Sequence, residues 1–334
     1  MAVTLYKSTD TSAPTLTGAV GSLVALLDAI LVNGYGSQSA AGWTIAYTGT
    51  NKRDYKQGTG SNSYYLDIDD SGPTTAKEAR MRGYEAMTAL GTGTMAFPTS
   101  SQSSFGVVCR KSTTADSTAR PWYCVADATC FHLFVDTGDY TGPAYSMAFS
   151  FGDFFSYKSG DTYNTAIVGR SGENQSSDGY ESLPVLTPSG VLNSAAGVAP
   201  GSYIDRLWTG VGGSTPIGKM SGAAIYGSVS TSIPTVIGSA SAPLSYPNGP
   251  DNALELAPLF LLAHGSILGY LKGLWSPMHY QPCGHADTFT GTGNMAGKSF
   301  LALNVRSTVT INSNNANGTN AQGQIVVETS NTWS

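Results

Sequence analysis

The sequence predicts a mainly β protein, β-sandwich-like and antiparallel, with two helices in its N-terminal region and long loops. Three observations predict this fold class. Charged residues make up 12% of the 334-residue chain, about half the share of an average soluble domain. Glycine is abundant, at 40 residues, and divides the chain into apolar runs of about one strand length. Only two segments carry a helical pattern.

The first predicted helix covers residues 20–31. Leu23, Leu27 and Leu31 recur at a spacing of four, which places them on one face of a helix. Thr17 precedes the segment as a candidate N-cap, and Gly34 follows it as a stop. We therefore expect an amphipathic helix packed against the rest of the protein.

The second predicted helix covers residues 76–90, where charged residues are densest. Met81 and Tyr84 form part of its expected apolar side. Glu78 and Arg82 are four residues apart in the order that favours a helical ion pair. A Gly-Thr-Gly segment at 91–93 is expected to end this helix.

The remaining pattern predicts short strands joined by turns and two long loops at 171–202 and 210–252. A hairpin turn is expected at Asp127–Ala128. The chain is predicted to form a single β-rich domain, 1–334, with a subdivision near 210–252 as the alternative. The predicted strands are residues 43–48, 52–57, 64–70, 105–110, 121–126, 129–135, 145–151, 163–170, 203–209, 254–263, 267–275, 298–305, 308–312 and 324–328.

The four cysteines are expected to be free. With a two-residue turn after Ala126, Cys124 and Cys130 point to opposite faces of the sheet and cannot bond. A register change of one residue would bring them together. We therefore expect buried thiols, consistent with assembly in a reducing cytoplasm.

One segment holds candidate metal ligands. His279, Cys283 and His285 are spaced as H-x3-C-x-H, and imidazole and thiolate are ligand types that zinc accepts. The competing interpretation is a surface loop with one buried thiol and two exposed imidazoles, and it is favoured because clusters of ligand types are far commoner than filled sites. We expect no metal and no cofactor.

Candidate acids for catalysis are few. Asp67 and Asp69 share one side of a predicted strand, so they are candidates for calcium binding or for acid–base chemistry. Asp136 and Asp139 form a second candidate pair. Turns at the ends of strands explain both groups equally well, and the chain is predicted not to be an enzyme.

Charge and hydropathy limit the partners. The formal net charge is −5, which disfavours a nucleic acid. The longest apolar stretch, residues 253–263, is too short to span a membrane, and the first residues lack the pattern of a secretory signal. Trp122, Trp208 and Trp275 are candidates for contact with a neighbouring protein or for stacking on sugars, although core positions explain strand tryptophans as well.

Several segments together resemble a family of structural proteins from the virions of tailed bacteriophages. They are residues 1–10, 34–36, 40–43, 77–85, 119–122, 151–154, 291–300 and 328–333. The likeness spans most of the chain, and no segment is a mechanistic motif.

The resemblance implies a structural component of a virion that assembles in the bacterial cytoplasm, with tail or baseplate attachment as the favoured position. A head-decorating protein and a receptor- or glycan-binding module are the alternatives. The expected partners are further copies of the chain and other virion proteins, with the host surface as an additional candidate.

Overall fold

The computed structural model of the protein describes residues 2–138, 145–170, 172–174, 201–220, 253–264, 266–277, 283–307 and 321–333. These residues are mainly β, and all named strand pairs are antiparallel. One helical segment stands out, α1 (Ser22–Leu27) continued by the π-helical η1 (Asp28–Asn33). A single 3-10 turn, η3 (Gly293–Met295), is also described.

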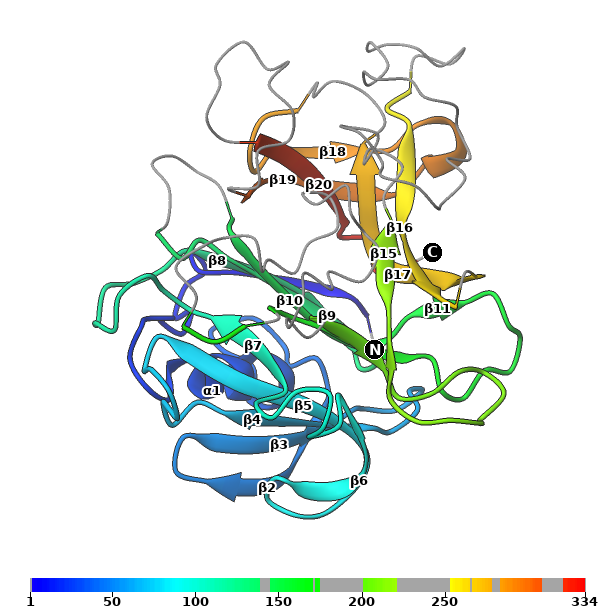
Figure 1. Ribbon diagram of the computed structural model, residues 1–334. Coiled ribbons are helices and arrows are strands. Elements are labelled where there is room, and N and C mark those ends of the chain that lie inside the picture. The colour runs from blue at the N-terminus through cyan, green and yellow to red at the C-terminus, as the bar shows by residue number, and fades with distance from the viewer. Residues whose placement is uncertain are drawn as a thin grey trace.

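A central sheet runs through the middle of the molecule (Figure 1). Every residue of β9 and β10 is buried, which is expected of strands that are covered on both faces. The order of its seven strands is β1 (Thr4–Lys7), β8 (Trp122–Ala126), β9 (Cys130–Val135), β10 (Met147–Asp153), β12 (Thr165–Val168), β13 (Ser202–Ile204) and β14 (Thr215–Pro216).

A second sheet, called the lower sheet here after its place in Figure 1, covers one face of the central sheet together with α1. Its strands run in the order β2 (Thr44–Gly49), β3 (Lys52–Lys56), β4 (Tyr65–Asp69), β5 (Glu78–Ala89) and β6 (Thr92–Phe97), and β7 (Val107–Arg110) pairs with the first part of β5.

A third sheet, called the upper sheet, covers the other face of the central sheet (Figure 1). The chain passes from the central to the upper sheet between β14 and β15, at the buried Ile217. The upper sheet has the order β15 (Gly218–Met220), β16 (Leu256–Ala263), β17 (Ser266–Pro277), β20 (Ala321–Glu328), β19 (Ser299–Ser307) and β18 (Thr288–Thr290), and β11 (Phe155–Ser156) pairs with β17.

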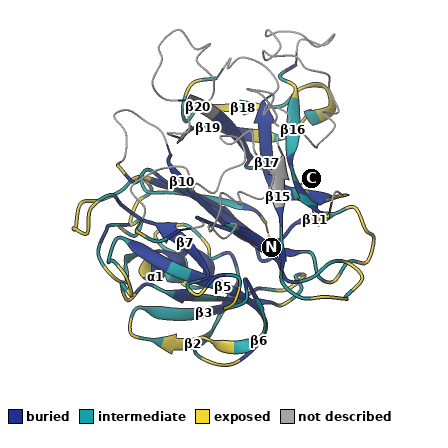
Figure 2. Ribbon diagram, in the orientation of Figure 1, coloured by how far each residue is buried: buried dark blue, intermediate teal, exposed yellow. Residues whose placement is uncertain are grey.

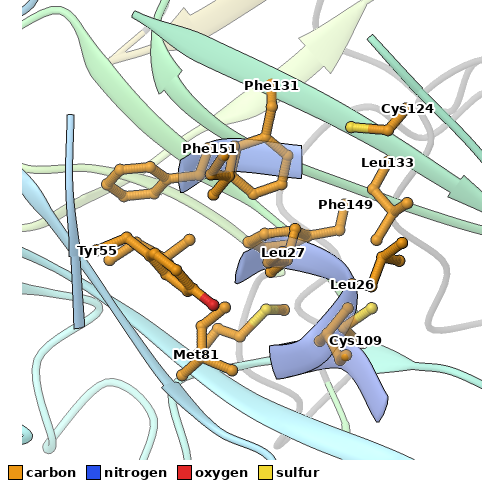
Figure 3. Packing of buried hydrophobic residues seen from close by; sticks show 14 of the residues in the cluster. Leu26, Leu27, Tyr55, Met81, Cys109, Cys124, Phe131, Leu133, Phe149 and Phe151 are labelled. Carbon is orange, nitrogen blue, oxygen red and sulfur yellow. The ribbon is translucent and has the colours of Figure 1, made fainter. Parts of the chain in front are cut away.

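Successive side chains of the central strands point to opposite faces of the sheet, and this divides the hydrophobic core into two parts. Phe131, Phe149 and Phe151 point toward the lower sheet and α1 (Figure 3), whereas Phe134 and Ala148 point toward the upper sheet. Residues with opposite parity on one strand lie on opposite faces. β10 is therefore dark along its length in the burial view, while β2 carries exposed residues (Figure 2).

The first predicted helix is confirmed, but its cap is different from the expected one. The backbone N–H groups of Leu23 and Val24 donate to Asp70 Oδ2 at 2.8 and 3.4 Å, and no side chain of a neighbouring residue caps the helix. Asp70 is itself paired with Lys111, and both side chains are fully buried. A carboxylate that is distant in the sequence thus takes the capping role that was expected of Thr17.

The second predicted helix is wrong, because residues 78–89 form strand β5. Charged Glu78, Arg80 and Arg82 alternate with Ala79 and Met81, which is the period of two that a half-buried strand requires. Ala79 and Met81 are buried in the core. Glu78 pairs at 3.2 Å with Arg170, two residues after the end of β12, instead of with Arg82.

Most other predicted strands are confirmed, with shifts at their ends. The strand predicted at 203–209 ends at Ile204, and residues 308–312 lie outside the described residues. In the hairpin, Cys124 pairs with Leu133 and Ala126 with Phe131, so the turn is two residues longer than expected. A shift of two residues leaves every side chain on the face that was expected. Cys124 and Cys130 therefore lie on opposite faces as free, buried thiols.

The structure does not confirm the finer prediction of a β-sandwich, because the described residues form three sheets rather than two. The long loops at 171–202 and 210–252, and the subdivision proposed near the second, fall largely on residues 175–200 and 221–252, which lie outside the described residues.

Candidate functional site

An aromatic cluster is exposed where β11 meets β17, at the edge of the upper sheet. The rings of Phe155 and Tyr270 stack with centroids 4.8 Å apart and an interplanar angle of 22°. The Tyr157 ring is nearly perpendicular to that of Phe155 at 6.2 Å, and the Trp275 ring is tilted against that of Tyr270 at 6.3 Å. Phe155 and Tyr157 are 44% and 56% exposed. We call these four residues the aromatic edge.

Backbone contacts place the aromatic edge. β11 approaches β17 so closely that a Cβ on Gly269 would lie 1.8 Å from the carbonyl oxygen of Phe155, so only glycine is tolerated there. The Tyr157 N–H donates to Leu268 O at 2.9 Å. Ser156 Oγ donates to Asp161 Oδ2 at 2.7 Å, which holds the loop that follows. The exposed rings are thus carried by an ordered segment.

A second exposed apolar group lies in the turn after β13. Trp208 and Val211 are 41% and 74% exposed. Arg206 supports this turn, because it donates to Gly210 O at 3.0 Å and its guanidinium lies 4.8 Å from the ring centroid of Tyr163. Tyr163 belongs to the segment that follows the aromatic edge, so the two exposed groups lie on neighbouring loops.

The three tryptophans predicted as contact residues differ in their exposure to solvent. Trp122 is fully buried, and its Nε1 donates to Pro14 O at 3.2 Å, so it offers no surface to a partner. Trp275 is 6% exposed and donates to Glu328 Oε2 at 3.3 Å. It is the buried member of the aromatic edge. Trp208 is exposed. Sequence reasoning missed Phe155 and Tyr157, although the phenylalanine–tyrosine run at 154–157 is visible in the sequence.

The predicted metal-ligand segment is only partly described, since His279 lies outside the described residues. His285 Nδ1 accepts a hydrogen bond from the Asn304 N–H at 3.1 Å, and its ring stacks on Tyr145 at 5.4 Å. Burial raises the pKa of the Cys283 thiol, which disfavours the thiolate that a metal needs. Within the described ranges, no group of three or more His, Cys, Asp or Glu side chains is arranged to hold a metal ion.

The predicted carboxylate pair is rearranged. Asp69 binds Lys52 at 2.7 Å, and the partner of Asp67 is Asp54, directly opposite on β3. Asp54 is fully buried, which differs from the open cleft that acid–base hydrolysis of a sugar requires. Of the other candidate pair, Asp139 lies outside the described residues, and Asp136 Oδ1 accepts the Gly138 N–H at 2.9 Å.

A buried thiol–imidazole pair on β9 was not expected from the sequence. Cys130 Sγ lies 4.0 Å from His132 Nε2. His132 is also bonded to Ser150 Oγ and to the carbonyl oxygen of Lys272, both at 2.8 Å. Burial raises the pKa of Cys130 and lowers that of His132 to about 4. A neutral thiol beside a neutral imidazole is a structural pair rather than an activated nucleophile.

No protein-family model matches the chain, and no curated protein sequence matches it. Among the described residues, no helix has the length and apolar character needed to cross a membrane.

Proposed function

We propose that the protein is a structural component of a tailed bacteriophage virion, tail- or baseplate-associated, and that it catalyses no reaction. In this proposal the three packed sheets act as one sandwich-like rigid body that presents the aromatic edge to neighbouring copies of the chain or to other virion proteins. The observation that carries the proposal is the exposure of Phe155 and Tyr157 on an ordered sheet edge.

The free energy gained by burying these rings favours a role for them in a protein–protein interface. Aromatic side chains bury a large area with few rotatable bonds, which is why they dominate protein interfaces. Phe155 is already stacked on Tyr270, so little further order is lost when its outer face is covered. The second apolar group, Trp208 and Val211, lies in the turn that Arg206 joins to Tyr163, and in this proposal it belongs to the same contact surface.

The ionisable groups support a structural role. Asp70, Glu78 and Asp69 are engaged in ion pairs with Lys111, Arg170 and Lys52. The first two pairs join segments that are 41 and 92 residues apart, and the third joins the neighbouring strands β3 and β4. Such pairs specify a fold, whereas catalysis needs an acid or base with room for a substrate.

Two other positions or roles remain as alternatives within the same class. A head-decorating protein would use the same kind of surface at a higher copy number. A receptor- or glycan-binding module would stack sugar rings on Phe155 and Tyr157, and this alternative is favoured by the exposed ring faces and the neighbouring hydroxyl groups.

The test compares the double variant Phe155→Ala/Tyr157→Ala with Val20→Ala, because Val20 is as exposed as Phe155, at 44%, and lies beside α1, outside the aromatic edge. Purified chains are examined by size exclusion with light scattering, and particles assembled with each variant are analysed by quantitative mass spectrometry. We expect the double variant to lose self-association or incorporation, while Val20→Ala behaves as the unmodified chain.

The outcomes separate the alternatives. Absence of the unmodified chain from particles would reject the virion role. Hundreds of copies per particle would indicate head decoration, and a few to a few dozen would indicate the tail. Normal incorporation of the double variant together with loss of binding to host cells would favour the glycan or receptor role instead.

A further inference from the structure

Two parallel rows of charged side chains cross the outer face of the lower sheet. In the first row, Lys52, Asp69 and Arg80 are direct neighbours on β3, β4 and β5. Their charges alternate as cation, anion, cation, and Lys52 Nζ lies 2.7 Å from Asp69 Oδ2. This row has the cross-strand arrangement that stabilises a sheet.

The second row, two residues along, breaks this pattern. Asp54, Asp67 and Arg82 occupy the equivalent positions on the same strands, so two acids stand directly opposite each other. Arg82 cannot balance both acids, because it carries one positive charge, and its Nη2 is directed to Ser103 O at 2.6 Å. Like charges in direct cross-strand positions destabilise a sheet.

The tip of the β5–β6 hairpin lies directly on this acid pair. The Gly91 N–H donates to Asp54 Oδ2 at 3.1 Å, and a Cβ on Gly91 would lie 3.9 Å from both carboxyl oxygens of Asp67. Two hydroxyl groups anchor the same hairpin, since Tyr84 donates to Gly91 O and Tyr47 donates to Met87 O, each at 3.3 Å. The tip therefore closes over a fully buried Asp54.

One proton makes this arrangement stable. Asp54 Oδ1 is buried, and no N–H or hydroxyl group in the described part of the chain donates to it. Asp54 and Asp67 are direct cross-strand neighbours, and two facing carboxyl groups can share a hydrogen bond only when one of them is protonated. Burial, followed by the hydrogen bond and the negative charge of Asp54, raises the pKa of Asp67 to about 8.

The other groups around the pair do not remove the need for that proton. Burial raises the pKa of Asp54 as well, and Asp69 adds a further negative charge near Asp67. The titratable and charged groups that face the pair from β2, β3, β4 and β5 are Tyr47, Lys52, Lys56, Tyr65, Asp69, Arg82 and Tyr84. Lys52 is engaged with Asp69 and Lys56 with the ring of Tyr65.

We propose that Asp54 and Asp67 form a proton-dependent latch, in which one shared proton holds the β5–β6 tip closed over the lower sheet and its loss at alkaline pH releases the tip. A carboxyl group that holds its proton more tightly in the folded state stabilises that state at low pH. This contribution declines as the pH rises from about 4, the ordinary value for Asp, toward the folded value. The latch is independent of the virion role.

Hydrogen exchange of the full chain at pH 6 and pH 9 tests the latch. Protection factors, corrected for intrinsic exchange rates, are compared for residues 88–94 at the tip and for β9 in the central sheet. Between pH 6 and the folded pKa of Asp67, each pH unit should raise the open fraction about tenfold, and the rise should level off above that pKa. We expect the tip to lose protection about a hundredfold between pH 6 and pH 9, while β9 keeps its protection.

Two matched variants complete the test. Asp67→Asn replaces the acid by a permanently neutral donor and should hold the tip closed at both pH values. Asp69→Asn, on the same face two residues away, removes an acid that is paired with Lys52 and should leave the alkaline loss in place. Equal tip protection of the unmodified chain at both pH values, equal loss in Asp67→Asn, or a parallel loss in β9 would each overturn the proposal. If Asp67→Asn does not fold, Asp54→Asn takes its place.

Discussion

The two faces of the central sheet are packed by different kinds of side chain. Toward the lower sheet the core is richer in aromatic rings, and Trp43 lies in edge-on contact with Phe131 and Phe151 at 5.6 and 5.9 Å. Toward the upper sheet it is largely aliphatic, with leucines and valines from β16, β17, β19 and β20. The aromatic side lies between the central sheet, the lower sheet and α1, and the aliphatic side lies between the central and upper sheets.

Buried ion pairs are distributed unequally between the two sides. The aromatic side is bordered by the pairs Asp70–Lys111 and Glu78–Arg170, in which both partners are buried. The upper sheet also holds a buried carboxylate, Glu328, but its partner Lys298, 3.0 Å away, is partly exposed. The aliphatic side is bordered in addition by the neutral His132.

The largest effect is expected on the aromatic side. Lys111→Met leaves the Asp70 carboxylate buried without its cation and should lower the free energy of unfolding by about 3–5 kcal/mol. Urea unfolding followed by circular dichroism measures the change. The double variant Lys111→Met/Asp70→Leu should recover part of the loss, because no unpaired charge remains. A double variant weaker than the single one would contradict this reason.

Paired truncations compare the two cores directly. Phe151→Ala should cost about 3–5 kcal/mol on the aromatic side, and Leu261→Ala about 2–5 kcal/mol on the aliphatic side. Because both cores share the central sheet, each variant should shift one cooperative unfolding transition. Two separate transitions by calorimetry would indicate instead that the sides unfold as different units.

Lowering the pH should change the contributions of the two sides in opposite directions. His132 has an ordinary pKa of about 6.5 when unfolded and about 4 when folded, so its contribution is complete above pH 6.5 and is lost as the pH falls toward 4. The expected loss is up to about 3 kcal/mol. The pKa of buried Asp70 is raised to about 6, so its contribution has the opposite sign and declines as the pH rises from about 4 to 6. Unfolding of His132→Gln between pH 4 and pH 7 should lack the acid-dependent part.

The smallest effect on stability is expected at the aromatic edge. Tyr157→Ala removes a side chain that is 56% exposed and should change the free energy of unfolding by less than about 0.5 kcal/mol. Thermal unfolding measures it. A loss above 1 kcal/mol would mean that Tyr157 supports the upper sheet, and its proposed role in contact would then need a different residue.

Much of the secondary structure follows from local sequence patterns, because apolar residues that recur every second or every fourth position can be recognised within a short segment. The helix that begins at Ser22 and strands such as β9 and β19 were predictable in this way. β5 was predicted as a helix because Glu78 and Arg82 also fit a helical spacing. Pairing with β4 and β7 favours the strand over the helix, because it buries Ala79 and Met81.

The candidate sites depended far more on tertiary contacts. Phe155 and Tyr157 lie in the sequence beside Phe151 and Phe154, which are buried, and composition alone does not separate the two kinds. The Asp54–Asp67 pair joins residues 13 positions apart, and only strand register makes them neighbours.

By itself, the sequence determined that the chain is a low-charge, glycine-rich β protein with an N-terminal helix and free thiols, because composition and short-range periodicity are local properties. The tertiary structure alone decided that three sheets stack, that Asp70 caps a helix from 47 residues away, and which aromatic rings stay exposed. Those outcomes depend on which distant strands pair, and no local pattern specifies that choice.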